Sequence, residues 1–200
     1  MSFFIKKSWL YAPLLLLLAC GNNQGNSQQS AGVAGQNAGG EQVAESATAA
    51  HSNPAPQAGQ PATAIPDFGF YILKSGMSFG KGDLLPGDRQ VFILFDPSCS
   101  FCQHEAAYID KNFDKFENTN FYFISMNDPG LMSTFFDRFA SGLNNKPNVF
   151  MLYDRNVDFV NKFHIPSQFP ATYVYDANGL LTTFWNGVKT EEDMIQAILN

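Results

Sequence analysis

The stretch DPSCSFCQHE, Asp96–Glu105, holds two of the three cysteines of this 200-residue chain. It directly follows VFILF (91–95), a continuous apolar run of the kind found in a strand buried on both faces. A helix is expected from about residue 100 to residue 116, so Cys99 lies where a buried strand gives way to a helix. The free amide groups and the positive dipole end of a helix start stabilise an anion, which favours a thiolate at Cys99. The stretch therefore indicates a buried strand followed by a helix that begins at a reactive thiol.

The spacing of the two cysteines suits thiol–disulfide exchange. Two intervening residues place the Cys102 thiol about one turn into the helix, from where it can reach back and close a disulfide with Cys99. Cys99 is expected to be the exposed attacking thiol, and Cys102 the more buried resolving thiol. A purely structural disulfide is a weaker explanation, because closing so short a loop removes little conformational entropy from the unfolded chain.

Metal binding is the other explanation of the pair. A zinc half-site needs two further ligands, and His104 and His164 form no recognisable second half. Two thiols and a histidine can bind copper, so a copper-binding protein remains an alternative. The third histidine, His51, lies in a polar stretch and is expected to be solvated. The redox interpretation itself requires no cofactor.

Strand-like and helix-like patterns alternate through residues 67–200. The expected strands are 68–73, 91–95, 121–126, 148–154, 171–176 and 180–185, and the last two form a hairpin because Asn178-Gly179 supplies positive φ at the turn. The expected helices are 100–116, with Phe101, Ile109, Phe113 and Phe116 on its buried face, 131–140, 157–163 and 190–199. Thr190 and Asp193 resemble a capping box at the start of the last helix. A Gly- and Asp-rich loop is expected between the first two strands.

This order predicts an α/β fold with a central mixed β-sheet and helices on both of its faces. The hairpin adds an antiparallel edge to the sheet. The strand at 68–73 fits either edge, and the sequence does not place it.

The N-terminus has the features of an export signal. Lys6 and Lys7 precede the apolar run WLYAPLLLLLA (9–19), which is too short to cross a bilayer as a helix. The run ends in Leu-Leu-Ala-Cys and resembles the bacterial lipoprotein signal, in which the cysteine receives a diacylglyceryl group and becomes the new N-terminus. By this resemblance residues 1–19 are a signal peptide, and Cys20 anchors the protein to a membrane through its acyl chains.

Composition divides the rest of the chain into a tether and a domain. Residues 20–66 are rich in Gly, Asn, Gln, Ser, Ala and Pro and contain no aromatic residue, so a disordered tether is expected there. Residues 67–200 hold 18 of the 20 Phe, and their 10 basic and 16 acidic residues give a net charge of −6. A mildly acidic domain without a basic run offers no surface for nucleic acid.

The domain resembles the TlpA-like, membrane-anchored thiol–disulfide oxidoreductases, which have a thioredoxin-like fold. The resemblance covers nearly all of residues 67–200. It rests on the strand that runs into Cys99-Ser100-Phe101-Cys102, and on Glu105, three residues past the second cysteine. It rests also on HIPSQFPATYVYDANGLLTTFWNG (164–187), with a proline before a strand, Asp and Gly at a turn, and a closing Gly.

The resemblance implies roles for further residues. Pro170 would be the family's cis-proline, with Phe169 before it facing the disulfide, and Phe169 and Ser98 would contact the substrate. Pro166 competes for the cis-proline position, but Pro170 directly precedes a strand. Ile93 holds the position of the buried Asp of thioredoxin, so Glu105 is the candidate that replaces it as a proton shuttle; the alternative is a helix-surface carboxylate.

Two further departures concern Ser98, which replaces the tryptophan of thioredoxin, and Ser100-Phe101, which replace Gly-Pro. Asp96 is either a cap at the helix start or a charge that opposes thiolate formation.

The sequence thus predicts an extracytoplasmic, lipid-anchored thiol–disulfide oxidoreductase of the cell envelope, periplasmic or on the cell surface. Its partners would be exported proteins with thiols or disulfides and a membrane electron donor or acceptor, since the compartment is oxidising. The direction of transfer stays open. The alternatives are a copper-binding protein on the same fold and a non-catalytic surface lipoprotein.

Overall fold

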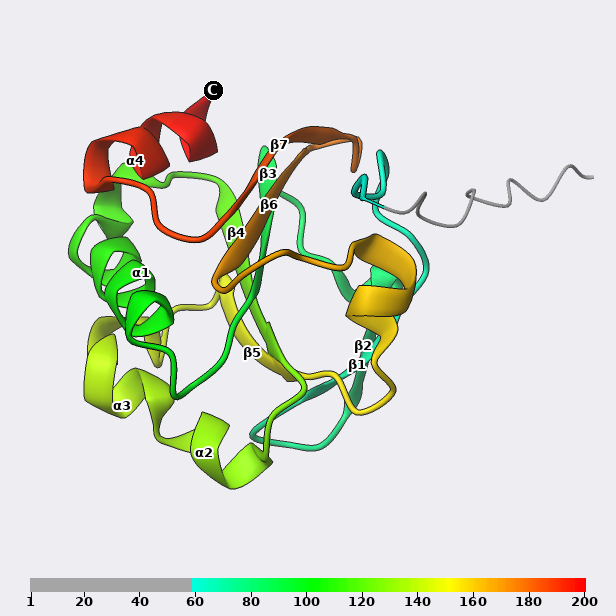
Figure 1. Ribbon diagram of the computed structural model, residues 1–200, viewed down its shortest axis with the longest axis vertical. Helices are drawn as coiled ribbons and strands as arrows, with labels where there is room; N and C mark the ends of the chain where they lie inside the picture. Colours follow the sequence, from blue (N-terminus) through cyan, green and yellow to red (C-terminus); the bar gives the residue numbers. More distant parts are fainter. Residues whose placement is uncertain (1–58) are drawn as a thin grey trace, which may run out of the picture. The chain divides into compact units, whose positions relative to one another are not determined.

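The computed structural model describes residues 59–200, and every structural statement below concerns these residues (Figure 1). The strands are β1 Gly69–Ile72, β2 Ser78–Gly80, β3 Arg89–Leu94, β4 Thr119–Ser125, β5 Val149–Tyr153, β6 Ala171–Asp176 and β7 Leu181–Asn186. The α-helices are α1 Ser100–Lys111, α2 Pro129–Ser133, α3 Phe135–Phe139 and α4 Glu191–Leu199. Short 3₁₀ turns occur at Lys81–Asp83 (η1), Phe113–Lys115 (η2) and Ser141–Leu143 (η3), and a π-helical segment at Phe159–Phe163 (η4). None of the described helices is long and apolar enough to cross a membrane.

The seven strands form one mixed sheet in the order β2-β1-β5-β4-β3-β6-β7. The central strands β3, β4 and β5 are parallel to one another, while β6, β7, β1 and β2 pair antiparallel. The mixed sheet and its antiparallel hairpin edge are therefore as predicted. The strand at 68–73, which the sequence did not place, joins the edge next to β5.

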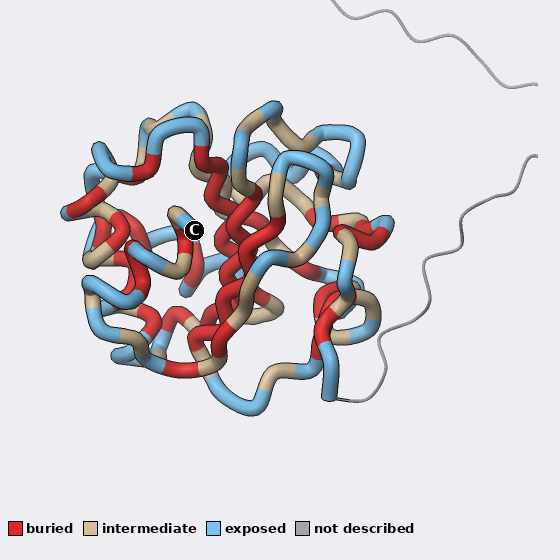
Figure 2. Tube along the Cα trace, turned by 90° about the horizontal axis from the view of Figure 1, so that it is seen from above, coloured by how far each residue is buried: buried red, intermediate tan, exposed pale blue. Residues whose placement is uncertain are grey.

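The two faces of the sheet are covered differently. Figure 1 shows the α-helices on one side of the sheet and η4 on the other. Alternate residues of the apolar strand β3 serve the two cores: Val91 and Ile93 point to the helices, while Phe92 and Leu94 pack with Phe163 of η4. Strands β3 and β4 are buried along nearly all of their length (Figure 2). On the second face, the helix predicted at 157–163 is the short π-helical segment η4, Phe159–Phe163.

Three expectations about elements need correction. The first helix ends at Lys111 rather than residue 116, and Phe101 on it is 54% exposed instead of buried. The inward face of α1 carries Cys102, Glu105, Ala106 and Ile109. The helix expected at 131–140 is two short helices separated at Thr134, and the loop expected after β1 contains β2.

The folded part begins before residue 67. Pro61 and Ile65 are buried, and the backbone of this segment bonds to η4 and to β7, through Ala62 N to Phe163 O (2.7 Å) and Leu181 N to Thr63 O (2.9 Å). Residues 60–66 thus belong to the domain rather than to the tether. The expected signal peptide, Cys20 and the tether up to residue 58 lie outside the described residues.

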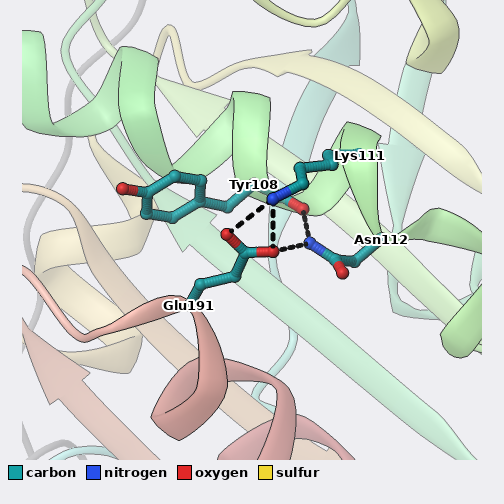
Figure 3. A network of polar contacts seen from close by, with 4 residues as sticks. All are labelled: Tyr108, Lys111, Asn112 and Glu191. Carbon is teal, nitrogen blue, oxygen red and sulfur yellow. Dashed lines mark hydrogen bonds and ion pairs between the residues drawn. The ribbon is translucent and has the colours of Figure 1, made fainter.

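A polar network joins α1 to α4 (Figure 3). The Asn112 side-chain amide, just past the end of α1, donates to the Tyr108 carbonyl (2.9 Å) and to Glu191 Oε1 (2.7 Å). Lys111 Nζ lies 3.1 Å from both carboxylate oxygens of Glu191. Asn112 is buried, so its amide satisfies a carboxylate at the first turn of α4, where the helix dipole also favours negative charge. The network fixes the C-terminal end of the helix that carries the cysteines.

Candidate functional site: two thiols and a buried carboxyl

The two cysteines lie at the start of α1, as the sequence predicted. Cys99 is the N-cap residue and half-buried, whereas Cys102 is 2% exposed and belongs to the core between α1 and the sheet. Both are free thiols in the structure. Burial raises the pKa of Cys102 above the ordinary range of a thiol, and the neighbouring Cys99 and Glu105 raise it further. The accessible thiol is therefore Cys99, and Cys102 needs a proton acceptor before it can act as a nucleophile.

Glu105 lies one turn further along the same inward face of α1. It is 6% exposed, which excludes the alternative of a surface carboxylate. Burial raises its pKa to about 7, while the hydroxyl of Thr172, which donates to Glu105 Oε1 at 2.5 Å, acts in the opposite direction. The Trp185 indole also lowers this pKa, although its N–H does not meet hydrogen-bond geometry with any described residue. A carboxyl in this state can both accept and donate a proton near neutral pH.

Strand register explains why these groups meet. Thr172 of β6 pairs with Ile93 of β3 on one side and with Trp185 of β7 on the other. Ile93 occupies the position where thioredoxin has its buried acid, and the polar groups of this part of the core come instead from α1, β6 and β7. The site therefore keeps a buried acid but takes it from a different element.

The segment before β6 has the cis-proline that the resemblance implied. The Phe169–Pro170 peptide bond is cis. Phe169 is half-buried and packs against both cores, including the cluster that contains Cys102 and against which Cys99 also packs. The Pro170 carbonyl accepts a hydrogen bond from Gly187 N at 2.7 Å, and Gly187 has a φ of 77°, a conformation that glycine adopts without strain.

The remaining residues discussed from the sequence lie around the start of α1, at or near the surface. Ser98 is exposed, and its backbone N–H (2.8 Å) and hydroxyl (2.6 Å) both donate to Asp96 Oδ1. Asp96 thus closes the turn before α1 instead of capping the helix, since the N-cap residue is Cys99. Phe101, between the cysteines, is open to solvent.

The histidines lie apart from one another. His104 is exposed on α1, whereas His164 is buried on the opposite face of the sheet, with its Nδ1 2.7 Å from the Tyr173 hydroxyl. Within residues 59–200, no group of three or more His, Cys, Asp or Glu side chains is arranged to hold a metal ion.

Sequence reasoning did not identify Thr172 and Trp185. Thr172 could have been noticed as the one aliphatic hydroxyl residue inside the apolar strand ATYVYD, because a buried polar side chain needs a partner. Trp185 carries no comparable signal, since an aromatic residue at the end of a strand is most often part of the core.

Comparison with known proteins supports this chemistry. No protein-family model and no curated protein sequence matches the chain. Among solved structures it is similar to a secreted disulfide oxidoreductase of Mycobacterium tuberculosis homologous to E. coli DsbE, with 25% identity and a TM-score of 0.55 over 66% of this chain and 94% of that one.

Two further structures share the fold. Mycobacterial DsbF has 20% identity and a TM-score of 0.52 over 66% of this chain and 92% of that one. A SCO1/SenC family lipoprotein from Bacillus anthracis has 18% identity and a TM-score of 0.51 over 72% and 98%. The described residues form a thioredoxin-like domain, similar in structure to these thiol–disulfide oxidoreductases and Sco-type proteins.

Proposed function

We propose that this protein is a thiol–disulfide oxidoreductase that acts on exported proteins through Cys99 and Cys102. The observation that carries the proposal is the arrangement of three groups on α1: a half-exposed thiol at the helix start, a buried thiol one turn on, and a buried carboxyl one turn further. A structural cysteine pair does not need a titratable group beside it. A disulfide exchange centre does, because its buried thiol has to lose and regain a proton.

In the reducing direction the thiolate of Cys99 attacks a disulfide of the substrate and displaces one substrate thiolate. The Cys102 thiol then gives its proton to the Glu105 carboxylate, and the Cys102 sulfur attacks Cys99. The mixed disulfide breaks, the Cys99–Cys102 disulfide forms, and the second substrate thiolate leaves with the electron pair. Two electrons pass from the dithiol to the substrate. The oxidising direction reverses each step, with Glu105 as the acid.

The substrate is proposed to lie across Pro170 and Phe169, with Ser98 at the rim of the same surface. Phe169 and Cys99 both pack against the core cluster that contains Cys102, which supports a role for this aromatic side chain in substrate contact. Exported proteins are the proposed substrates because the similar mycobacterial oxidoreductase is described as secreted and the N-terminus resembles a lipoprotein signal. A membrane electron donor would restore the dithiol after each reducing turnover, and a membrane electron acceptor would restore the disulfide after each oxidising one.

Capture of the mixed disulfide tests the proposal. In Cys102→Ser, Cys99 still attacks but nothing resolves the product, so partners should accumulate on Cys99 as species that a reductant releases. The matched control, Cys99→Ser, should capture none. The identity of the captured proteins names the substrates and indicates the direction of transfer. Equal capture by the two variants, or none by either, together with a wild-type pair that never changes redox state, would disprove the oxidoreductase proposal.

The membrane anchor has a separate test. If Cys20 is acylated, wild-type protein should fractionate with membranes and incorporate labelled palmitate, and Cys20→Ser should do neither. Membrane association of the unlabelled Cys20→Ser variant would contradict lipid anchoring through this residue.

A further inference from the structure

Trp185 has an unexplained polar atom in the core. The residue is 7% exposed at the end of β7, and its indole Nε1 is one of two buried side-chain polar atoms among the described residues that have no hydrogen-bond partner. A buried indole N–H usually finds a partner, because a donor left unsatisfied in the core destabilises the fold. The orphaned donor therefore calls for a partner that is present in another state of the site.

The nearest candidate is the carboxyl of Glu105. Strand register sets Trp185 beside Thr172, whose hydroxyl already donates to Glu105 Oε1 at 2.5 Å. A carboxylate accepts several hydrogen bonds, so one oxygen remains for a second donor after Thr172. A protonated carboxyl is a poorer acceptor than an ionised one, and charge-assisted hydrogen bonds are the stronger kind. The indole donor would thus gain its partner when Glu105 ionises.

Few other charged groups face this carboxyl. Cys99, the N-cap residue, and Cys102 precede it along the same helix. A cavity of about 10 Å³ beside Glu105 is also lined by His104 and Tyr108 from α1, by Val188 and Lys189 from the loop after β7, and by Met194 from α4. The Lys189 ammonium lies 5.4 Å from the centre of the Trp185 ring. His104, Tyr108 and Lys189 are therefore the other titratable side chains that lie close to Glu105 or Trp185.

We propose that Trp185 is a positioning residue whose indole N–H hydrogen-bonds the ionised carboxylate of Glu105, the form that accepts the proton of Cys102. Its catalytic consequence rests on the proposed function, but the contact itself does not. Without the indole donor the carboxylate keeps only Thr172, so it binds a proton more tightly. Less of it is then available as a base at neutral pH, and the resolving attack of Cys102 slows there.

The first test observes the indole directly. Trp9 and Trp185 are the only tryptophans of the chain, so the full chain carrying Trp9→Phe and labelled with [15N]tryptophan gives one indole N–H resonance. In the reduced protein this resonance should move downfield as the pH rises from 5 to 9, with a midpoint near 7, where Glu105 titrates. The movement should be lost in Glu105→Gln and kept in His104→Gln, Tyr108→Phe and Lys189→Met. If the chemical shift of the indole N–H does not follow the ionisation of Glu105, the proposed hydrogen bond between Trp185 and Glu105 is wrong.

The second test measures the resolving step. Cys99 is loaded with thionitrobenzoate, and the attack of Cys102 releases the coloured thiol in a single turnover. For Trp185→Phe the midpoint of the pH–rate profile should rise by about one pH unit, so that the rate falls roughly fivefold to tenfold at pH 7 and hardly changes at pH 9. The core variant Phe136→Leu should lower thermal stability without moving the midpoint.

The outcomes separate the two proposals. An unmoved midpoint in Trp185→Phe shows that the residue is only part of the core. A chain that never releases the coloured thiol and captures no partner lacks the proposed exchange function, while the indole titration still decides the contact between Trp185 and Glu105.

Discussion

At the scale of single residues, the site depends on a carboxyl whose ionised form the core disfavours. Burial raises the pKa of Glu105 to about 7. Burial also raises the pKa of the Cys102 thiol, and the charge of Glu105 adds to that shift. Near neutral pH the carboxyl is therefore divided between its two protonation states, while Cys102 keeps its proton until Glu105 accepts it.

The same burial makes stability depend on pH. The pKa of Glu105 is about 7 in the folded chain, above the ordinary carboxyl value of 4.5. Below the ordinary value the group is protonated in both states, and its stabilising contribution is complete. Between pH 4.5 and 7 the unfolded chain ionises at this position while most folded chains keep the proton. The free energy of unfolding therefore falls by about 3 kcal/mol by the time the pH has risen through 7. Relative to wild type, Glu105→Gln should therefore gain up to this amount between pH 4.5 and pH 8.

Urea unfolding of the reduced proteins at several pH values measures this difference. Glu192→Gln, an exposed carboxyl on α4, serves as the matched control and should track wild type at every pH. A constant difference between wild type and Glu105→Gln would mean that Glu105 titrates normally in the fold.

Individual residues show what sequence reasoning can and cannot predict. The roles of Cys99 and Cys102 follow from spacing and from the start of a helix, both of which are local. The burial of Phe101 was predicted wrongly, because α1 turns Cys102, Glu105 and Ala106 inward, so that the apolar residue faces solvent. The contact between Glu105 and Thr172 spans 67 positions and depends on strand register, which local pattern does not specify.

At the scale of elements, the orientation of α1 depends on the polar tie to α4. Asn112 is buried and donates to two acceptors, whereas Lys111 reaches the same carboxylate from solvent. A hydrogen bond from Asn112, then one from Lys111, and the charge of Lys111 lower the pKa of Glu191. The tie therefore stabilises the fold above the ordinary carboxyl pKa and weakens as the pH falls through the lowered one.

This contrast predicts unequal effects of two substitutions. Asn112→Ala leaves the Tyr108 carbonyl without its side-chain donor and should reduce the free energy of unfolding by about 1–3 kcal/mol. Lys111→Ala removes an exposed ion pair and should cost below about 1 kcal/mol. Denaturant unfolding at pH 7 compares them. Equal losses would contradict this prediction, because they would show that the exposed ion pair contributes as much as the buried amide.

Long, strongly patterned elements were predicted well, and short ones were not. The apolar strands β3 and β4 and the hairpin β6–β7 have sequence patterns that fit a strand far better than a helix or a loop. Gly179 at the hairpin turn has the positive φ that was expected. Strand β2 is three residues long and forms because β1 offers it an edge, through pairs such as Phe70 with Phe79. Such an element has no signal of its own.

At the scale of the whole molecule, the start of the domain is set by packing rather than by composition. Residues 60–66 read as a continuation of the polar, Pro-rich segment, yet Ile65 is 2% exposed and its carbonyl accepts a hydrogen bond from Lys81 Nζ at 2.6 Å. The segment closes the second core beside η4 and the hairpin turn, where Ile65 N donates to the Gly179 carbonyl at 2.9 Å. A few buried side chains, Pro61 and Ile65 among them, and a few backbone hydrogen bonds suffice to bring the segment into the fold.

The contribution of this segment can be measured. Ile65→Ala should reduce the free energy of unfolding by about 2–5 kcal/mol, because it removes buried apolar surface and leaves a cavity. Thr63→Ala, whose side chain is exposed, should stay within about 0.5 kcal/mol of wild type. A chain that begins at residue 67 should lose at least as much stability as Ile65→Ala, since it lacks the backbone bonds as well. If chains that begin at residues 59 and 67 unfold at the same urea concentration, the segment adds nothing, and the domain starts where composition alone had placed it.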